Sequence, residues 1–323
     1  MSEEFDLMDG IPVRSEKIEF DRSQLVACGA CSRPNAPNRA ECIYCGTALS
    51  IVTDGRSTLK IRDVESWEKA FNIVLIGKGE HSSESDGLPL DADVVQKALN
   101  FGPPMPLGRV GTADAAAAVN ERSSGSGLQT TVVSDESLNA ENPPVRLRSL
   151  SVAAGGIVLT TFNMNERLEF PSDSLRLIVV GRLFEERLEQ SLKKKRGGVK
   201  EIDGRNISKD SGVVDLYFGD DPNGFRITES GFNFSGLGER KSFVAAENIK
   251  AVVDQLRSTA PLAAVSTDYI SKRSTLEKIW PSTMRNDSKG VQRAKFGLTV
   301  EKAEVSTNTE QFTKYSRLVR RTI

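Results

Sequence analysis

All four cysteines of this 323-residue chain fall within one stretch of eighteen residues, and this clustering constrains the fold more than any other feature. They form two pairs, Cys28 with Cys31 and Cys42 with Cys45; two residues separate the members of each pair, and ten residues separate the pairs. Two such knuckles facing each other supply four thiolates in a closed tetrahedral set, which is the ligand set of a structural zinc site. We therefore expect one Zn²⁺ on these cysteines. No coordination position stays open for water, so the metal would hold the segment folded rather than catalyse a reaction.

Gly29 and Gly46 would give the two knuckles a permissive backbone, so that amide groups can turn toward the sulfurs. Three other uses of the cysteines stay open. Two disulfides need an oxidising compartment, a redox pair normally begins a helix in a thioredoxin-like unit, and iron can occupy a rubredoxin-like site. The N-terminal MSEEFDLMDG is acidic, where a signal peptide would be basic and then apolar, and no apolar run is long enough to span a membrane. We therefore expect a cytoplasmic protein with reduced cysteines.

The run from Cys28 to Gly46, with Asn35 between the two pairs and Thr47-Ala48-Leu49 after them, resembles the short zinc ribbon near the N-terminus of many uncharacterised bacterial proteins. Its spacing is also similar to the zinc finger of Ran-binding proteins, a family that binds single-stranded RNA or ubiquitin. That family's tryptophan two residues before the first cysteine is Val26 here, and Tyr44 is the only aromatic residue in the ribbon. Fewer rings are therefore available to stack on RNA bases. The resemblance covers residues 25–50 only.

Catalytic residues are scarce in this sequence. The one histidine, His81, excludes most mechanisms that pair a serine or cysteine with histidine, or that gather several histidines on a metal. There is no GxSxG or HExxH motif, and zinc would use every thiol. Gly77-Lys78-Gly79 lacks the spacing of a phosphate-binding loop. We therefore expect no enzymatic activity.

Composition divides the chain into modules, which predicts a multidomain α+β protein. The expected order is an acidic flexible tail (1–22), the zinc ribbon (23–50), a linker (51–68), a small α/β module (69–135), a second linker (136–147), a β-rich α+β domain (148–265) and a basic C-terminal extension (266–323).

The small module is predicted to have the order β-α-α-β. Phe71–Ile76 is an apolar, β-branched run that predicts a buried strand. Apolar residues at helical spacing in Asp91–Leu99, and an alanine run after the N-cap residue Thr112, predict two helices, the second ending at Arg122. Leu128–Val133 would be the returning strand.

The β-rich domain is predicted from short β-branched or aromatic runs bounded by turn residues. These runs are Arg148–Ala153, Gly156–Phe162, Ser174–Gly181, Val213–Phe218, Gly224–Thr228 and Phe232–Phe234, and we expect them to pair antiparallel. Between them, Leu183–Leu192 predicts a helix and Lys193–Lys200 a flexible basic loop. Glu247–Ser258 predicts an amphipathic helix. This order of elements is typical of a pleckstrin-homology-like domain, with a generic α+β sheet capped by a helix as the alternative.

Charge is balanced overall, at a formal net charge of −1, but it is unevenly distributed. Residues 272–323 carry twelve basic and five acidic side chains. Phe312, Tyr315, Leu318 and Val319 lie at helical spacing there, which predicts a basic amphipathic helix docked on the protein's own body. The densest basic cluster, Lys193–Arg196, is flanked by acidic residues, so we expect a solvated loop and leave an anionic ligand open.

These features together predict a non-enzymatic cytosolic adaptor or regulatory protein that uses a structural zinc ribbon and a β-rich domain for protein-protein interaction. The partner protein is not identified by the sequence. The alternative is a nucleic-acid-binding protein in which the ribbon and the basic C-terminal segment act together. A homo-oligomer is left open, and binding to a membrane surface is not expected.

Overall fold

The computed structural model describes residues 25–36, 39, 41–47, 49, 64–65, 67–77, 88–153, 156–194, 200–294 and 297–323, without the side chains of 190–203 and 288–302. It is a mixed α+β structure in two compact units, Met1–Leu59 and Lys60–Ile323. The predicted acidic tail (1–22), the loop around His81 and most of the linker 51–68 lie outside the described residues. The first unit contains the short strands β1 (Val26–Ala27) and β2 (Pro34–Asn35).

A three-stranded antiparallel sheet begins the second unit, in the order β4-β3-β5. Its strands are β3 (Phe71–Gly77), β4 (Met105–Val110) and β5 (Gln129–Ser134). The predicted first and last strands are confirmed as β3 and β5, and Ile73, Val74 and Leu75 in the central strand are fully buried. The edge strand β4 was not predicted, because Pro106 and Gly108 within it are turn residues by composition; an edge position tolerates such a proline.

Three helices accompany this sheet. Both helices predicted for the small module are confirmed, as α1 (Ala92–Phe101) and α2 (Ala113–Gly125), and α3 (Asp135–Leu138) follows β5. Asp91 caps α1 by accepting from the backbone of Asp93 and Val94. Thr112 caps α2 as predicted, accepting from Ala115 N at 3.3 Å. Local capping signals therefore place both helix starts correctly.

The large sheet has the strand order β13-β14-β9-β10-β11-β6-β7-β8, with β12 paired to β9. Its strands are β6 (Val145–Ala153), β7 (Gly156–Thr161), β8 (Arg167–Pro171), β9 (Leu175–Lys194), β10 (Lys200–Phe218), β11 (Phe225–Thr228), β12 (Ala264–Ser266), β13 (Thr283–Ala294) and β14 (Gly297–Thr307). Most pairs are antiparallel as predicted, but β11 pairs parallel with β6 and β12 with β9. The predicted strand Phe232–Phe234 contributes only an isolated bridge between Asn233 and Ser149. Two short 3-10 helices are also present: Ser172–Ser174 lies between β8 and β9, and Phe234–Arg240 lies between β11 and the next helix.

The helix predicted at Leu183–Leu192 is wrong, because this segment is the second half of the twenty-residue strand β9. There β9 is hydrogen-bonded on both sides, with Arg187 opposite Ile207 of β10 and opposite Val305 of β14. Pairing with two strands from distant parts of the chain overrides the local helical pattern. Of the predicted loop 193–200, Lys193 and Lys194 belong to β9 and Lys200 begins β10, and residues 195–199 lie outside the described residues.

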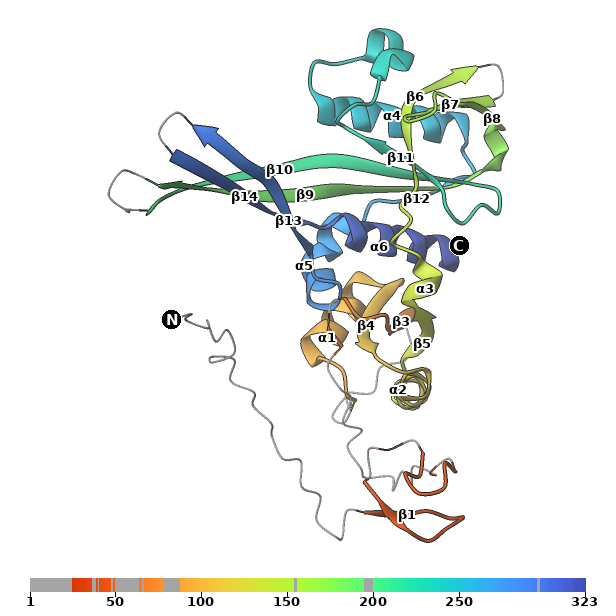
Figure 1. The fold of residues 1–323 in the computed structure, drawn as a ribbon. Coiled ribbons are helices and arrows are strands. Elements are labelled where there is room, and N and C mark those ends of the chain that lie inside the picture. Colours follow the sequence, from red (N-terminus) through yellow and green to blue (C-terminus); the bar gives the residue numbers. More distant parts are fainter. Residues whose placement is uncertain are drawn as a thin grey trace, which may run out of the picture. The chain divides into compact units, whose positions relative to one another are not determined.

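The two faces of β10 pack against different helices, following the two-residue alternation of a strand. Val214, Leu216 and Phe218 belong to an apolar cluster with α4 (Ala245–Thr259), the confirmed amphipathic helix. Tyr217 points to the opposite face, where its hydroxyl lies 2.8 Å from Ser316 Oγ of α6 (Thr309–Thr322). Figure 1 shows α4 and α6 on opposite sides of the long strands β9 and β10.

Residues 266–323, expected as a basic extension, supply α5 (Tyr269–Ile279), β13, β14 and α6 to the compact second unit. The amphipathic helix predicted around Phe312 and Tyr315 is confirmed as α6, and it docks on the protein's own body with Leu318 and Val319 also buried. The division between the two compact units falls within the predicted linker 51–68, whereas the second predicted linker, 136–147, lies inside the unit Lys60–Ile323. In that unit α5 contacts β4 of the small sheet and β9 of the large sheet.

Candidate metal centre

Two backbone knuckles form the metal centre in the first unit. In the first knuckle, Ser32 N donates to Cys28 O at 2.8 Å, and in the second, Gly46 N donates to Cys42 O at 2.9 Å. Each knuckle ends at a residue with positive φ, 55° at Ser32 and 71° at Gly46. Gly46 thus has the role expected of it, whereas the left-handed residue of the first knuckle is Ser32 and not Gly29. The antiparallel pair β1 and β2 closes the first knuckle.

The four sulfurs converge as the cysteine spacing predicts. All four Sγ atoms lie within 4.8 Å of one another, with separations of 3.6 Å for Cys28 and Cys45 and for Cys31 and Cys42. Tetrahedral coordination with metal-sulfur bonds of about 2.3 Å places neighbouring sulfurs about 3.8 Å apart. The observed separations fit that geometry and exceed the roughly 2.05 Å bond of a disulfide. These four cysteines are therefore positioned to hold one metal ion.

Asn35 orients the second knuckle from a buried position, with 2% of its surface exposed. Its Nδ2 lies 3.4 Å from Cys42 Sγ and donates to Arg33 O at 2.9 Å, while its Oδ1 accepts from Ile43 N at 3.0 Å. One amide side chain thus contacts a ligand sulfur and the backbone of both knuckles. In the sequence Asn35 is only one position in the spacing between the two cysteine pairs, and that spacing does not indicate this role.

The thiols differ in how readily they ionise. Burial raises the pKa of Cys42, but the N–H groups of Tyr44 and Cys45 and the amide of Asn35 outweigh it and lower that pKa to about 6. The N–H of Arg33 lowers the pKa of Cys31, yet burial and the neighbouring thiols raise it to about 12. Negative charge on one sulfur opposes charge on the next, so a cation must bind for all four to be thiolates. The cluster therefore has the chemistry of a metal site.

The sequence also draws attention to Tyr44, the only aromatic residue of the ribbon, to the nearby basic residues Arg33 and Arg39, and to the segment Gly77-Lys78-Gly79. Arg33 lies over the ring of Tyr44 at 4.9 Å, and Arg39 is described only through its backbone contact to Ala36. In the segment Gly77-Lys78-Gly79, Gly77 ends β3, and the two residues after it lie outside the described residues. Arg33 meets the cysteines through its backbone, where Cys28 N donates to Arg33 O at 3.0 Å.

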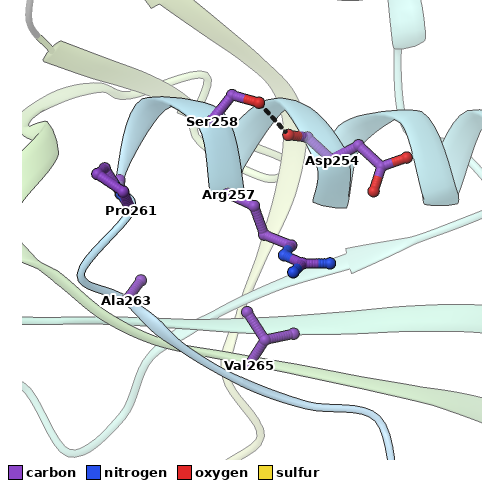
Figure 2. Close-up of a pocket in the computed structure, with 7 residues that line it drawn as sticks. Asp254, Arg257, Ser258, Pro261, Ala263 and Val265 are labelled. Atoms are coloured by element: carbon purple, nitrogen blue, oxygen red, sulfur yellow. Dashed lines mark hydrogen bonds between the residues drawn. The ribbon is translucent and has the colours of Figure 1, made fainter.

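A hollow of about 610 Å³ lies between the end of α4 and β12 in the second unit (Figure 2). Asp254, Arg257 and Ser258 line it from α4, and Val265 lines it from β12. The hydroxyl of Ser258 donates to the backbone oxygen of Asp254 at 2.9 Å, so it is committed to the helix. This hollow does not pair a nucleophile with a base.

No protein family model matches the chain, and comparison with curated proteins and with solved structures gives no match either. Among the described helices, none combines the length and the apolar character that crossing a bilayer requires.

Proposed function

We propose that this protein is a non-enzymatic cytosolic adaptor or regulatory protein. Its first unit, folded around zinc, would present the apolar residues Ile43 and Tyr44 of the second knuckle to a partner protein. The observation that carries the proposal is the exposure of Ile43 and Tyr44, at 53% and 50%, between two metal ligands. Large apolar side chains held outward by a rigid backbone are suited to protein recognition.

Zinc is the metal that best fits four thiolates in a closed set, and such a set is structural. The metal would fix Cys42 and Cys45, the residues on either side of the Ile43-Tyr44 knuckle. Asn35 Oδ1 accepts a hydrogen bond from Ile43 N, and the guanidinium of Arg33 lies over the Tyr44 ring. The backbone of Ile43 and the ring of Tyr44 are therefore held in place before binding, which lowers the entropic cost of recognition.

Nucleic-acid binding through the ribbon and the C-terminal bases is less well supported. Within the part of the chain that the structure describes, eight of the twelve basic residues in 272–323 contact the chain itself or are buried: Lys272, Arg273, Lys278, Arg285, Lys314, Arg317, Arg320 and Arg321. Bases used in this way are not free to neutralise phosphates. The pleckstrin-homology-like architecture expected for 148–265 does not enter the proposal.

The test is affinity purification of the full chain from its native host, at low and high salt, with and without nuclease, and with the metal content of each eluate measured. We expect a stoichiometric protein partner that survives nuclease and high salt, and one zinc per chain. The double variant Ile43→Ser, Tyr44→Ser should lose the partner and keep the zinc. Met164→Ser, which changes another exposed apolar side chain, should keep both.

Three results would overturn the proposal. The first is a partner that binds the double variant as well as the unchanged chain, and the second is no stoichiometric partner at all. The third is nucleic acid that is lost steeply as salt rises, which would support the alternative function instead.

A further inference from the structure

A groove of about 930 Å³ lies in the second unit where α3, the start of β13 and α6 meet. Asn139 and Ala140 line it after α3, Thr283 lines it at the start of β13, and Lys314 lines it from α6. All of these residues belong to one compact unit, so the groove is a feature of a single folded body.

Two large apolar side chains stand exposed in this groove. Trp67, just before β3, is 79% exposed, and Met284, the second residue of β13, is 73% exposed. The other tryptophan of the chain, Trp280, is 2% exposed. Covering a tryptophan and a methionine removes a large apolar area from water, and tryptophan is strongly enriched among residues that dominate binding energy.

Charge in the groove is mostly negative. Five carboxylate residues and two lysines line it. Both lysines already face carboxylates of the groove, since Lys69 Nζ lies 3.9 Å from Glu136 and 3.8 Å from Glu141, and Lys314 Nζ lies 3.1 Å from Asp135. The side chains of Glu136 and Glu141 nevertheless remain 73% and 76% exposed. A partner that complements this surface must carry positive charge.

We propose that this groove binds a basic peptide segment of a partner protein. An apolar side chain of the segment would lie between Trp67 and Met284, and its lysines or arginines would face Glu136, Glu141 and Glu310. The inference rests on the proposed adaptor function, and it names the chemistry of a partner at a surface separate from the Ile43-Tyr44 knuckle.

The test selects ligands from a displayed library of random dodecapeptides against the full zinc-loaded chain. The expected result is enrichment of peptides that combine net positive charge with an aliphatic or aromatic residue. Binding of a selected peptide should shift the emission of Trp67 to shorter wavelength, because that ring becomes buried while Trp280 is buried already. The shift should be absent in Trp67→Phe.

Variants locate the binding site. Trp67→Ser and Met284→Ser should each weaken a selected peptide at least about tenfold. Changing Glu136 and Glu141 to lysine should also weaken binding of the peptide, and the loss of affinity should be larger at low salt than at high salt. The matched control is Phe243→Ser, which removes a fully exposed aromatic ring outside the groove and should leave affinity unchanged.

Several results would overturn this inference. They are no enrichment, enrichment of neutral or acidic peptides, or affinities that Trp67→Ser does not change. Self-association that Trp67→Ser abolishes, seen by sedimentation velocity, would make a second copy the occupant instead. The Ile43→Ser, Tyr44→Ser variant separates the two proposals, since it should bind the selected peptides normally even if the knuckle has no partner.

Discussion

Trp280 Nε1 donates a hydrogen bond of 2.8 Å to Asn72 Oδ1, although 208 residues separate the two in the chain. Both side chains are buried. The amide of Asn72 also donates to Val133 O at 3.0 Å and to Asp135 Oδ1 at 2.9 Å. Asn72 thus ties the central strand of the small sheet to the end of α5. This contact is one reason why residues 60–323 form one compact unit rather than separate modules.

Trp280→Phe should destabilise the second unit by about 1 to 3 kcal/mol, because it leaves the buried Oδ1 of Asn72 without a donor. The measurement is urea unfolding of the full chain followed by far-ultraviolet circular dichroism, since tryptophan fluorescence differs between the variants. Trp67→Phe is the matched control and should change stability by less than about 0.5 kcal/mol, because Trp67 is exposed. Equal stabilities for the two variants would contradict this role of Trp280.

Features encoded by neighbouring residues were predictable from the sequence. The cysteine spacing predicts the cluster of four sulfurs, the N-cap Thr112 with its alanine run predicts α2, and apolar periodicity predicts α1, α4 and α6. Each of these signals is contained within about twenty residues. The contact of Asn35 with a ligand sulfur could not be predicted in the same way, because it depends on how the loop between the knuckles brings the amide to Cys42.

Features that depend on distant partners were not predictable. The second half of β9 is a strand because β10 and β14 pair with its two sides, and neither pairing is visible in the local pattern of Leu183–Leu192. Asn72 lies within an apolar run, so the sequence shows only a buried strand. Its partner Trp280 comes from the segment that composition suggested was an extension.

Asp135 should make the second unit sensitive to acid. Burial raises the pKa of Asp135, but Lys314, together with hydrogen bonds from Asn72 and Arg109, lowers it below the usual value. The folded state therefore binds this proton less readily than the unfolded state. Its contribution to stability is present above the unfolded pKa of about 3.9, and is lost as pH falls through the lower folded value.

Asp135→Asn should accordingly cost about 3 kcal/mol at pH 7, because it leaves Arg109 and Lys314, whose side chains are only 7% and 14% exposed, without their carboxylate. The difference from the unchanged chain should shrink as pH falls below about 4. Urea unfolding at pH 7, 5 and 3 measures it. Glu136→Gln, at a carboxylate 73% exposed, is the control and should be nearly neutral at every pH. If Asp135→Asn lowers the free energy of unfolding by the same amount at all three pH values, the negative charge of Asp135 does not stabilise the fold.

Asp215 and Arg226 form a buried ion pair on the face of β10 that α6 covers. Arg226 donates to both carboxylate oxygens of Asp215, each at 2.7 Å, and to Thr313 Oγ1 at 3.1 Å. Asp215→Asn should cost about 3 to 5 kcal/mol by leaving a buried guanidinium uncompensated. Replacing both residues, as Asp215→Leu with Arg226→Met, should recover much of that loss.

Urea unfolding of the single and double variants measures the coupling between these two residues. The half-exposed pair of Arg182 and Asp210, at 3.0 Å, provides the comparison. Asp210→Asn should cost less than about 1 kcal/mol, because solvent screens that pair. If Asp215→Asn lowers the free energy of unfolding no more than Asp210→Asn does, burial does not determine how strongly the pair of Asp215 and Arg226 stabilises the fold.

Asn35 should tune the affinity of the metal centre without being a ligand. Asn35→Leu removes the amide beside Cys42 and the acceptor of the Ile43 N–H, and should weaken zinc binding about 10- to 100-fold. Asn35→Asp keeps the acceptor but replaces the donor with negative charge beside a thiolate, so it should also weaken binding. Competition of the full chain with a chromophoric chelator measures both affinities.

Glu41→Gln is the control for this series, because Glu41 is exposed and precedes the ligand Cys42 without a described contact to a sulfur. It should bind zinc as tightly as the unchanged chain, whereas Cys42→Ser should lose most of the affinity. If Asn35→Leu binds as tightly as Glu41→Gln, the four sulfurs alone set the affinity. If it binds as weakly as Cys42→Ser, Asn35 is needed for the knuckles to form and not only to orient them.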